Sequence, residues 1–140
     1  MKPAPRQTSL SALSVGLSEP DSSLLHEIFR KAGWRLFTVR ERRRALSCLA
    51  RNPVHVVITE KELPDWNWKG VLGDLRRLES PPQLIVTSRD ADERLWAEAL
   101  NVGAYDVLAQ PFNRDEVERV IASARRHFAA PPPQPSATVA

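Results

Sequence analysis

Short runs of apolar residues alternate along this chain with longer segments in which apolar residues recur every three or four positions. The short runs are rich in Val, Ile, Leu and aromatic residues and predict five strands, at residues 12–17, 35–39, 54–59, 83–88 and 105–109. Each longer segment predicts a helix, and the third of these patterns continues to Leu78. Gly33 and Gly103 are natural ends for the first and fourth helices, while Asn113 with Glu116 is typical of the start of the fifth.

Five strands that alternate with five helices on short connections predict a parallel sheet covered on both faces, because each parallel crossover needs a helix. The third and fourth strands are almost continuously apolar, as central strands of such a sheet should be. In open sheets of this kind the reactive groups lie beyond the carboxyl ends of the strands. The candidate site is therefore expected among residues 17–21, 60–62, 87–90 and 109–112.

Composition limits the chain to one folded domain. Its 140 residues, 42% of them hydrophobic, suffice for one core, which we expect to span residues 11–128. The polar segment 1–10 and the proline-rich segment 129–140 are predicted to be disordered arms. A single cysteine, Cys48, excludes an internal disulfide and favours the cytoplasm, and no apolar run is long enough to span a membrane.

The net charge of +3 gives little support to nucleic-acid binding, because Lys2 and Arg6 in the N-terminal segment supply two of these charges. A cluster of arginines begins the second helix, and we interpret it as a solvated, partly paired helix face; it comprises Arg40, Arg42, Arg43, Arg44 and Arg51. A basic nucleic-acid-binding module is retained as the least favoured alternative. His26, His55 and His127 lack metal-ligand spacing, so no metal is expected.

Four local motifs occur in a fixed order along the chain. They are "EPD" at residues 19–21, "EKELP" at 60–64, "TS" at 87–88 and "GAYDVLAQPF" at 103–112. Together they resemble the receiver domain of bacterial two-component response regulators, the CheY-like superfamily, over about residues 11–128. The resemblance implies a flavodoxin-like fold with strand order 2-1-3-4-5 and a role in phosphorelay signalling.

The resemblance also places the positions that carry the family's phosphorylation chemistry. Glu60 takes the phosphoacceptor position, and Gln110 takes the position of a lysine. The two acids expected for Mg²⁺ fall on Leu17 and Ser18, with Glu19 as the nearest acid, and the hydroxyl position falls on Ser88, with Thr87 as the adjacent alternative. Because the acid pair and the lysine are altered, the resemblance implies a site that binds no metal and uses no cofactor.

We therefore predict an atypical receiver that is not an enzyme and acts as a phosphorylation-independent interaction module without an attached output domain. The alternative is a true phosphoacceptor that uses an altered site. Two interpretations of Glu60 stay open. Its carboxylate could act as a fixed charge that holds Ser88, as a phosphorylated acceptor would, or it could be a relic acid that faces water.

The expected partner is another signalling protein or a second copy of the chain, without membrane and without nucleic acid. Trp66 and Trp68 follow the candidate crevice and are candidate docking residues, since Trp is enriched at interface hot spots. Trp96 is expected near the surface of the fourth helix, fifth strand and fifth helix, where the resemblance implies dimer or partner contacts. Val107 is a further candidate contact residue, and the resemblance implies that many members have a switching aromatic residue at this position, so the usual aromatic switch is absent.

Overall fold

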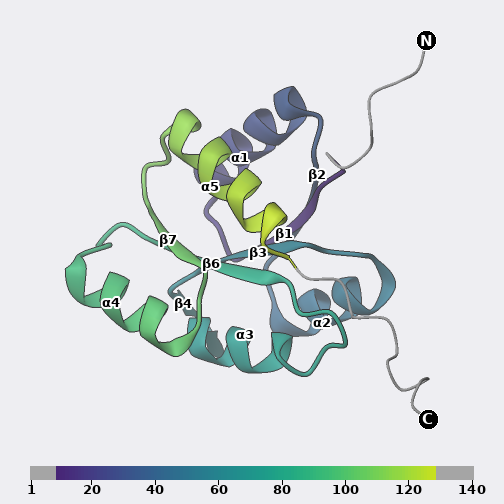
Figure 1. Ribbon diagram of the computed structural model, residues 1–140, viewed down its shortest axis with the longest axis vertical. Coiled ribbons are helices and arrows are strands. Elements are labelled where there is room, and N and C mark those ends of the chain that lie inside the picture. Colours follow the sequence, from purple (N-terminus) through teal and green to yellow (C-terminus); the bar gives the residue numbers. More distant parts are fainter. Residues whose placement is uncertain (1–8, 129–140) are drawn as a thin grey trace.

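A computed structural model describes residues 9–128 of the chain. Its centre is a five-stranded parallel sheet in the order β2-β1-β3-β6-β7 (Figure 1). The strands are β1 (Ser11–Val15), β2 (Arg35–Val39), β3 (Val56–Glu60), β6 (Gln83–Ser88) and β7 (Asp106–Ala109). The predicted parallel sheet and its order 2-1-3-4-5 are thus confirmed.

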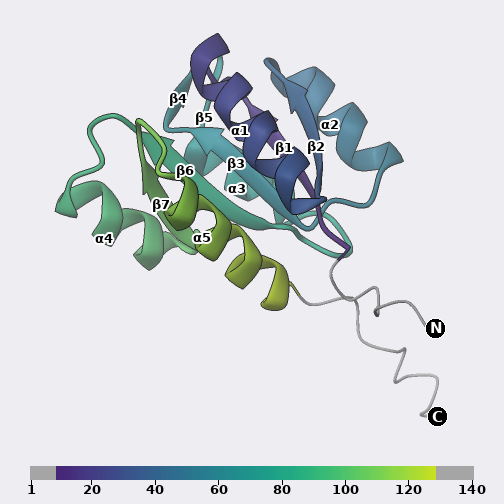
Figure 2. The ribbon, with the colours of Figure 1, turned by 90° about the horizontal axis from the view of Figure 1, so that it is seen from above.

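Helices cover both faces of the sheet, as Figures 1 and 2 show. On one face lie α1 (Glu19–Ala32) and α5 (Arg114–Arg126), and on the other lie α2 (Arg42–Arg51), α3 (Trp68–Leu75) and α4 (Glu93–Val102). Four of these helices have side-chain N-caps, since the side chains of Ser18, Asn67, Asp92 and Asn113 accept hydrogen bonds from the first turns of α1, α3, α4 and α5. Gly33 ends α1 in the left-handed conformation, with φ 78°, as predicted for a C-terminal glycine.

The core has two parts because side chains alternate between the faces of each strand. Ala12, Ile58 and Ile85 face α1 and α5, while Leu13, Val57 and Val86 face the three helices on the other side. All six side chains are essentially inaccessible to solvent. Burial on both faces explains why the third and fourth predicted strands are continuous apolar runs.

Several element boundaries differ from the prediction. The first strand ends at Val15 rather than at residue 17, because Gly16 has a positive φ that turns the chain away from the sheet. Helix α3 ends at Leu75, although the apolar pattern continued to Leu78. The sequence did not predict the short antiparallel hairpin of β4 (Glu62–Leu63) and β5 (Trp66–Asn67), which follows β3 directly.

The predicted arms lie outside the described residues, except for the last two residues of the first. Leu10 is 4% exposed and belongs to the core under α1 and α5, and the backbone oxygen of Ser9 accepts a hydrogen bond from Arg125. Within residues 9–128 no helix is both long enough and apolar enough to cross a membrane.

Candidate functional site

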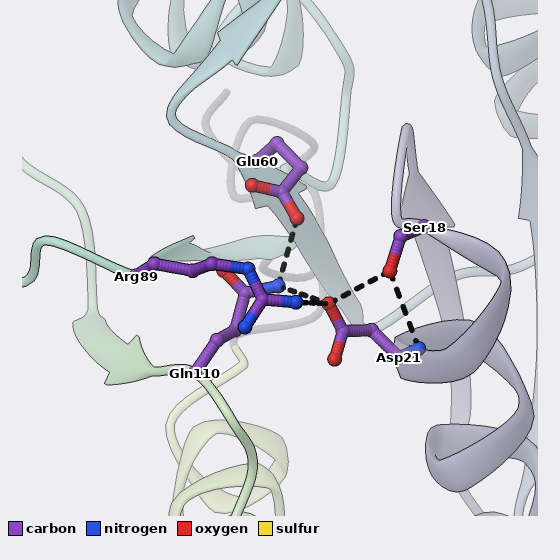
Figure 3. Close-up of polar contacts among 5 residues, drawn as sticks. All are labelled: Ser18, Asp21, Glu60, Arg89 and Gln110. Carbon is purple, nitrogen blue, oxygen red and sulfur yellow. Dashed lines mark hydrogen bonds and ion pairs between the residues drawn. The ribbon is translucent and has the colours of Figure 1, made fainter.

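A polar cluster lies where the carboxyl ends of the central strands meet. Glu60 is the last residue of β3, Gln110 directly follows β7, and Asp21 belongs to the first turn of α1, which β1 leads into. Figure 3 shows the three side chains converging from these separate elements, with Ser18 and Arg89 at either side. This position is the one expected for a site in an open parallel sheet.

The Gln110 amide bridges the two acids of this cluster. Its Nε2 atom donates to Oε2 of Glu60 at 2.8 Å and to Oδ2 of Asp21 at 2.9 Å (Figure 3). An amide nitrogen carries two hydrogens, so one group satisfies both carboxylates. Gln110 and Asp21 are each only 6% exposed, and Oε1 of Gln110 is buried without a hydrogen-bond partner among the described residues. The carboxylates therefore fix which end of the amide faces the site.

Asp21 is the most heavily bonded member of the cluster. Besides Gln110, its Oδ2 accepts from the Ser18 hydroxyl at 2.9 Å and from Nη2 of Arg89 at 3.0 Å. Ser18 in turn accepts from the Asp21 backbone N–H at 3.4 Å, so the N-cap of α1 also orients the buried carboxylate. The first turn of α1 is thereby part of the site.

Glu60 is half-buried, and its pKa lies above the ordinary value for a glutamate. Burial is the largest cause, because removal from water disfavours the charged carboxylate. The Gln110 hydrogen bond acts in the opposite direction, the negative charge of Asp21 adds to the increase, and the guanidinium of Arg89 reduces it. Glu60 is thus a half-buried acid whose charged form is disfavoured by burial, and not a free surface acid.

The donor set does not fit a divalent metal ion. Mg²⁺ needs several oxygen ligands in octahedral geometry, whereas the inward oxygens of Asp21 and Glu60 already face the N–H groups of one amide. The guanidinium of Arg89 brings a positive charge to the same oxygen of Asp21. Across residues 9–128, no three His, Cys, Asp or Glu side chains are grouped as metal ligands.

The three residues that the sequence assigned to the acid-pair positions, Leu17, Ser18 and Glu19, lie in three different environments. Leu17 is 2% exposed and lies in the core, Ser18 caps α1, and Glu19 is exposed on the first turn. The acid that reaches the cluster is Asp21 and not Glu19, which corrects the sequence-based assignment. The reason is helix geometry: with Ser18 as N-cap, the first turn directs residue 21 inward and residue 19 outward.

The two candidate hydroxyl residues end β6 and are both buried. Thr87 is the register partner of Glu60, and its hydroxyl donates to the Thr59 carbonyl at 3.4 Å. The Ser88 hydroxyl accepts from the Asp90 N–H at 3.0 Å and, within the described part of the chain, forms no hydrogen bond with Glu60. The Glu60 carboxylate is bonded to Gln110 instead, so the interpretation in which Glu60 holds Ser88 gains no direct hydrogen bond from the structure.

Two of the candidate docking residues are not available at the surface. Trp68, the first residue of α3, is 4% exposed and packs in the core on the side of α2, α3 and α4. Val107 is 3% exposed and packs in the same core. Both assignments as contact residues are corrected, since these side chains are held inside by the packing of β7 and α3. Trp66 is half-buried, and its indole N–H donates to Asp74 at 3.2 Å. Trp96, which is 46% exposed on α4, is the one that projects into solvent.

The arginine cluster is exposed and partly paired, as interpreted from the sequence. Arg42 forms an ion pair with Asp74 at 3.0 Å, and its guanidinium lies 5.9 Å from the centre of the Trp66 ring. Arg44 lies 3.9 Å from Glu41. The Arg42 contacts join α2 to α3 and to the β4–β5 hairpin, which gives this arginine a structural role.

Sequence reasoning placed Asp21 and Arg89 within the expected segments but did not name either as a member of the site. A signal for Asp21 was present, because the motif "EPD" contains two acids and a helix N-cap at Ser18 selects the second. Arg89 had no local signal, since it follows β6 in an exposed segment and reaches Asp21 across 68 positions of sequence.

Comparison with known proteins agrees with this geometry. A family model described as the response regulator receiver domain matches residues 20–122, so the chain belongs to the response regulator receiver family. The transcriptional regulatory protein KdpE of Mycobacterium tuberculosis is 35% identical over 100 residues, which are 70% of this chain and 43% of that protein. This chain thus spans less than half the length of that relative.

Two solved structures illustrate the shared fold. The signal receiver domain of an HD domain-containing protein from Pseudomonas fluorescens superposes with a TM-score of 0.75 at 25% identity, covering 86% of this chain and 97% of that one. The receiver domain of Ssk1 from Saccharomyces cerevisiae, solved together with the histidine phosphotransfer protein Ypd1, gives 0.75 at 16% identity over 87% and 92% of the two chains. These structures show the shared fold, and the family match identifies the chain as a receiver domain of two-component signalling.

Proposed function

We propose that this receiver acts as a phosphorylation-independent protein-interaction module, in which Glu60 takes the phosphoacceptor position and does not receive a phosphoryl group. One observation carries the proposal: Nε2 of Gln110 donates to both Glu60 and Asp21, at 2.8 and 2.9 Å. The two acids are satisfied by a neutral amide in the space where phosphoryl transfer would need a cation.

Electrostatics support the same conclusion. Phosphoryl transfer depends on positioning and on the neutralisation of charge around the transferred group. Here the amide of Gln110 brings no formal charge, and the guanidinium of Arg89 is bonded to Asp21. A phosphoryl group on Glu60 would convert its carboxylate to a more negative acyl phosphate beside the Asp21 carboxylate, whose one positive partner among the described residues is Arg89. We therefore propose that the chain is not an enzyme and that its output is a binding surface.

The partner proposed is another signalling protein or a second copy of this chain. The Ssk1 receiver, a structural neighbour, was solved with a histidine phosphotransfer protein, which supports a protein as the class of partner. The exposed side chains of Trp96 and Leu100 on α4, 46% and 40% accessible, are the large apolar groups available for such contact among the described residues. The single cysteine, Cys48, supports a cytoplasmic location.

The test is incubation of the full chain with acetyl phosphate and Mg²⁺, followed by intact mass measurement. A receiver domain with a complete set of acids and a lysine serves as positive control. We expect no mass change in this chain under conditions that modify the control. A Mg²⁺-dependent gain of one phosphoryl group, mapped to Glu60 by peptide sequencing, would overturn the proposal in favour of a true phosphoacceptor with an altered site.

A second experiment asks whether partner binding depends on the negative charge of Glu60. Glu60→Gln keeps the shape of the side chain and an oxygen that accepts from Gln110, but it removes the carboxylate. Proteins captured by the wild type and by this variant are compared, with Glu62→Gln as the matched change at an exposed glutamate two positions away. Loss of a partner in the first variant alone supports a fixed charge, whereas equal capture by all three chains supports a relic acid.

A further inference from the structure

The segment between β6 and α4, residues 89–92, is tied to α1 by one side chain. Nη2 of Arg89 lies 3.0 Å from Oδ2 of Asp21, and this contact spans 68 positions of sequence. Figure 3 shows the arginine reaching the carboxylate from the side opposite Ser18. The Asp21 side chain is 8% exposed and that of Arg89 is 60% exposed, so a surface arginine is anchored on a buried acid.

Charge explains why this acid needs an arginine. Asp21 and Glu60 share one amide donor, and neither gains a positive charge from Gln110. Two carboxylates that share a neutral bridge repel each other, and this repulsion is visible as one cause of the raised pKa of Glu60. Among the residues that the structure describes, Arg89 is the one cation that forms an ion pair with this cluster.

The rest of the segment makes local contacts. The Asp90 N–H donates to the Ser88 hydroxyl, and the Asp92 side chain caps α4 by accepting from the Leu95 N–H at 3.0 Å. Within residues 9–128, the Arg89 contact is the single hydrogen bond or ion pair that joins residues 89–92 to an element not adjacent in sequence. The Arg89–Asp21 contact therefore helps to fix the path of residues 89–92 into α4, the helix that bears Trp96.

We propose that Arg89 is a positioning residue: its guanidinium supplies the counter-charge of the Asp21–Glu60 pair and thereby fixes residues 89–92 in one conformation without any covalent modification. This inference rests on the proposed function, because it names how the interaction surface of an unmodified receiver is preset. The device needs three parts from three elements, which are the acid on α1, the amide after β7 and the arginine after β6.

The experiment is amide hydrogen exchange of the full chain, in buffer without Mg²⁺ or phosphodonor, for the wild type and for Arg89→Ala, Arg89→Lys and Arg94→Ala. Arg94 is the matched control, an exposed arginine on α4 without an ion pair in the described part of the chain. We expect exchange of residues 89–92 to be roughly two- to fivefold faster in Arg89→Ala, as expected for the loss of one partly exposed ion pair, and unchanged in Arg94→Ala. Arg89→Lys should restore part of the protection.

A double-mutant cycle with Asp21→Asn separates positioning from a general structural effect. If Arg89 acts through the Asp21 charge, Arg89→Ala should cause no further increase of exchange in the Asp21→Asn background. Equal exchange in the wild type and Arg89→Ala, or an equal increase in both backgrounds, would overturn the inference. Failure of the proposed function would show as phosphorylation of Glu60 and leaves this measurement unaffected, so the two failures are distinguishable.

Discussion

The side-chain amide nitrogen of Gln110 lies 2.8 Å from Oε2 of Glu60, which joins the ends of β7 and β3 across the strand between them. The same nitrogen lies 2.9 Å from Oδ2 of Asp21. A buried neutral group thus holds two acids together, and the stability of this end of the sheet should depend on it.

Replacement of Gln110 by leucine should destabilise the chain by about 1–3 kcal/mol, because two partly or fully buried carboxylates lose their shared donor. The measurement is urea unfolding followed by tryptophan fluorescence. Gln83→Leu is the matched control, since its amide donates to the His127 carbonyl at an exposed position and should cost less than about 0.5 kcal/mol. Equal stability of the wild type and Gln110→Leu would contradict the bridging role.

Glu60 should make stability fall as pH rises. Its pKa is higher in the folded chain than the ordinary value of 4.5, so the folded state holds the proton more tightly than the unfolded state does. Its contribution is complete below that ordinary value and is lost as pH rises through the higher folded pKa. The free energy of unfolding of Glu60→Gln minus that of the wild type should therefore increase between pH about 4 and about 7. A difference that is constant over this range would show that Glu60 is not perturbed.

His55 should act in the opposite direction. Its Nδ1 accepts a hydrogen bond from the Ser11 N–H at 3.0 Å, and burial, followed by the charge of Arg125, lowers its pKa below 6.5. A depressed folded pKa means that stability is complete above the unfolded value and decreases as pH falls toward the folded one. His55→Gln keeps an acceptor without this titration, so the stability of the wild type relative to this variant should fall as the pH is lowered from about 7 to about 5. No change in their relative stability would refute this assignment.

Trp68 and Trp96 should respond oppositely to substitution by alanine. Trp68→Ala empties a core position and should cost about 3–5 kcal/mol, whereas Trp96→Ala should alter the free energy of unfolding by less than about 0.5 kcal/mol. Partner capture should be lost in Trp96→Ala while its urea midpoint is unchanged. Normal capture by Trp96→Ala would exclude the exposed face of α4 as the contact surface.

The alternation of strands and helices could be predicted from the sequence because it is written in local patterns. The apolar runs of β3 and β6, the glycine that ends α1 and the cap at Asn113 are each determined within a few residues. The hairpin that follows β3 escaped prediction, since its strands have two residues each and carry no periodicity. The site was predicted at the correct edge of the sheet, where the strands have their carboxyl ends, with Glu60 and Gln110 at its centre.

What the sequence determined by itself was the order of elements, the edge at which polar residues meet, and the presence of Glu60 and Gln110 at that edge. Tertiary structure decided which acid and which cation complete the cluster. Asp21 faces inward because the N-cap at Ser18 sets the rotation of α1, and Arg89 reaches it because β6 and β1 end at the same edge of the sheet. The Arg89 contact depends on the three-dimensional relation of segments that are far apart in the chain, and no local pattern of residues records that relation.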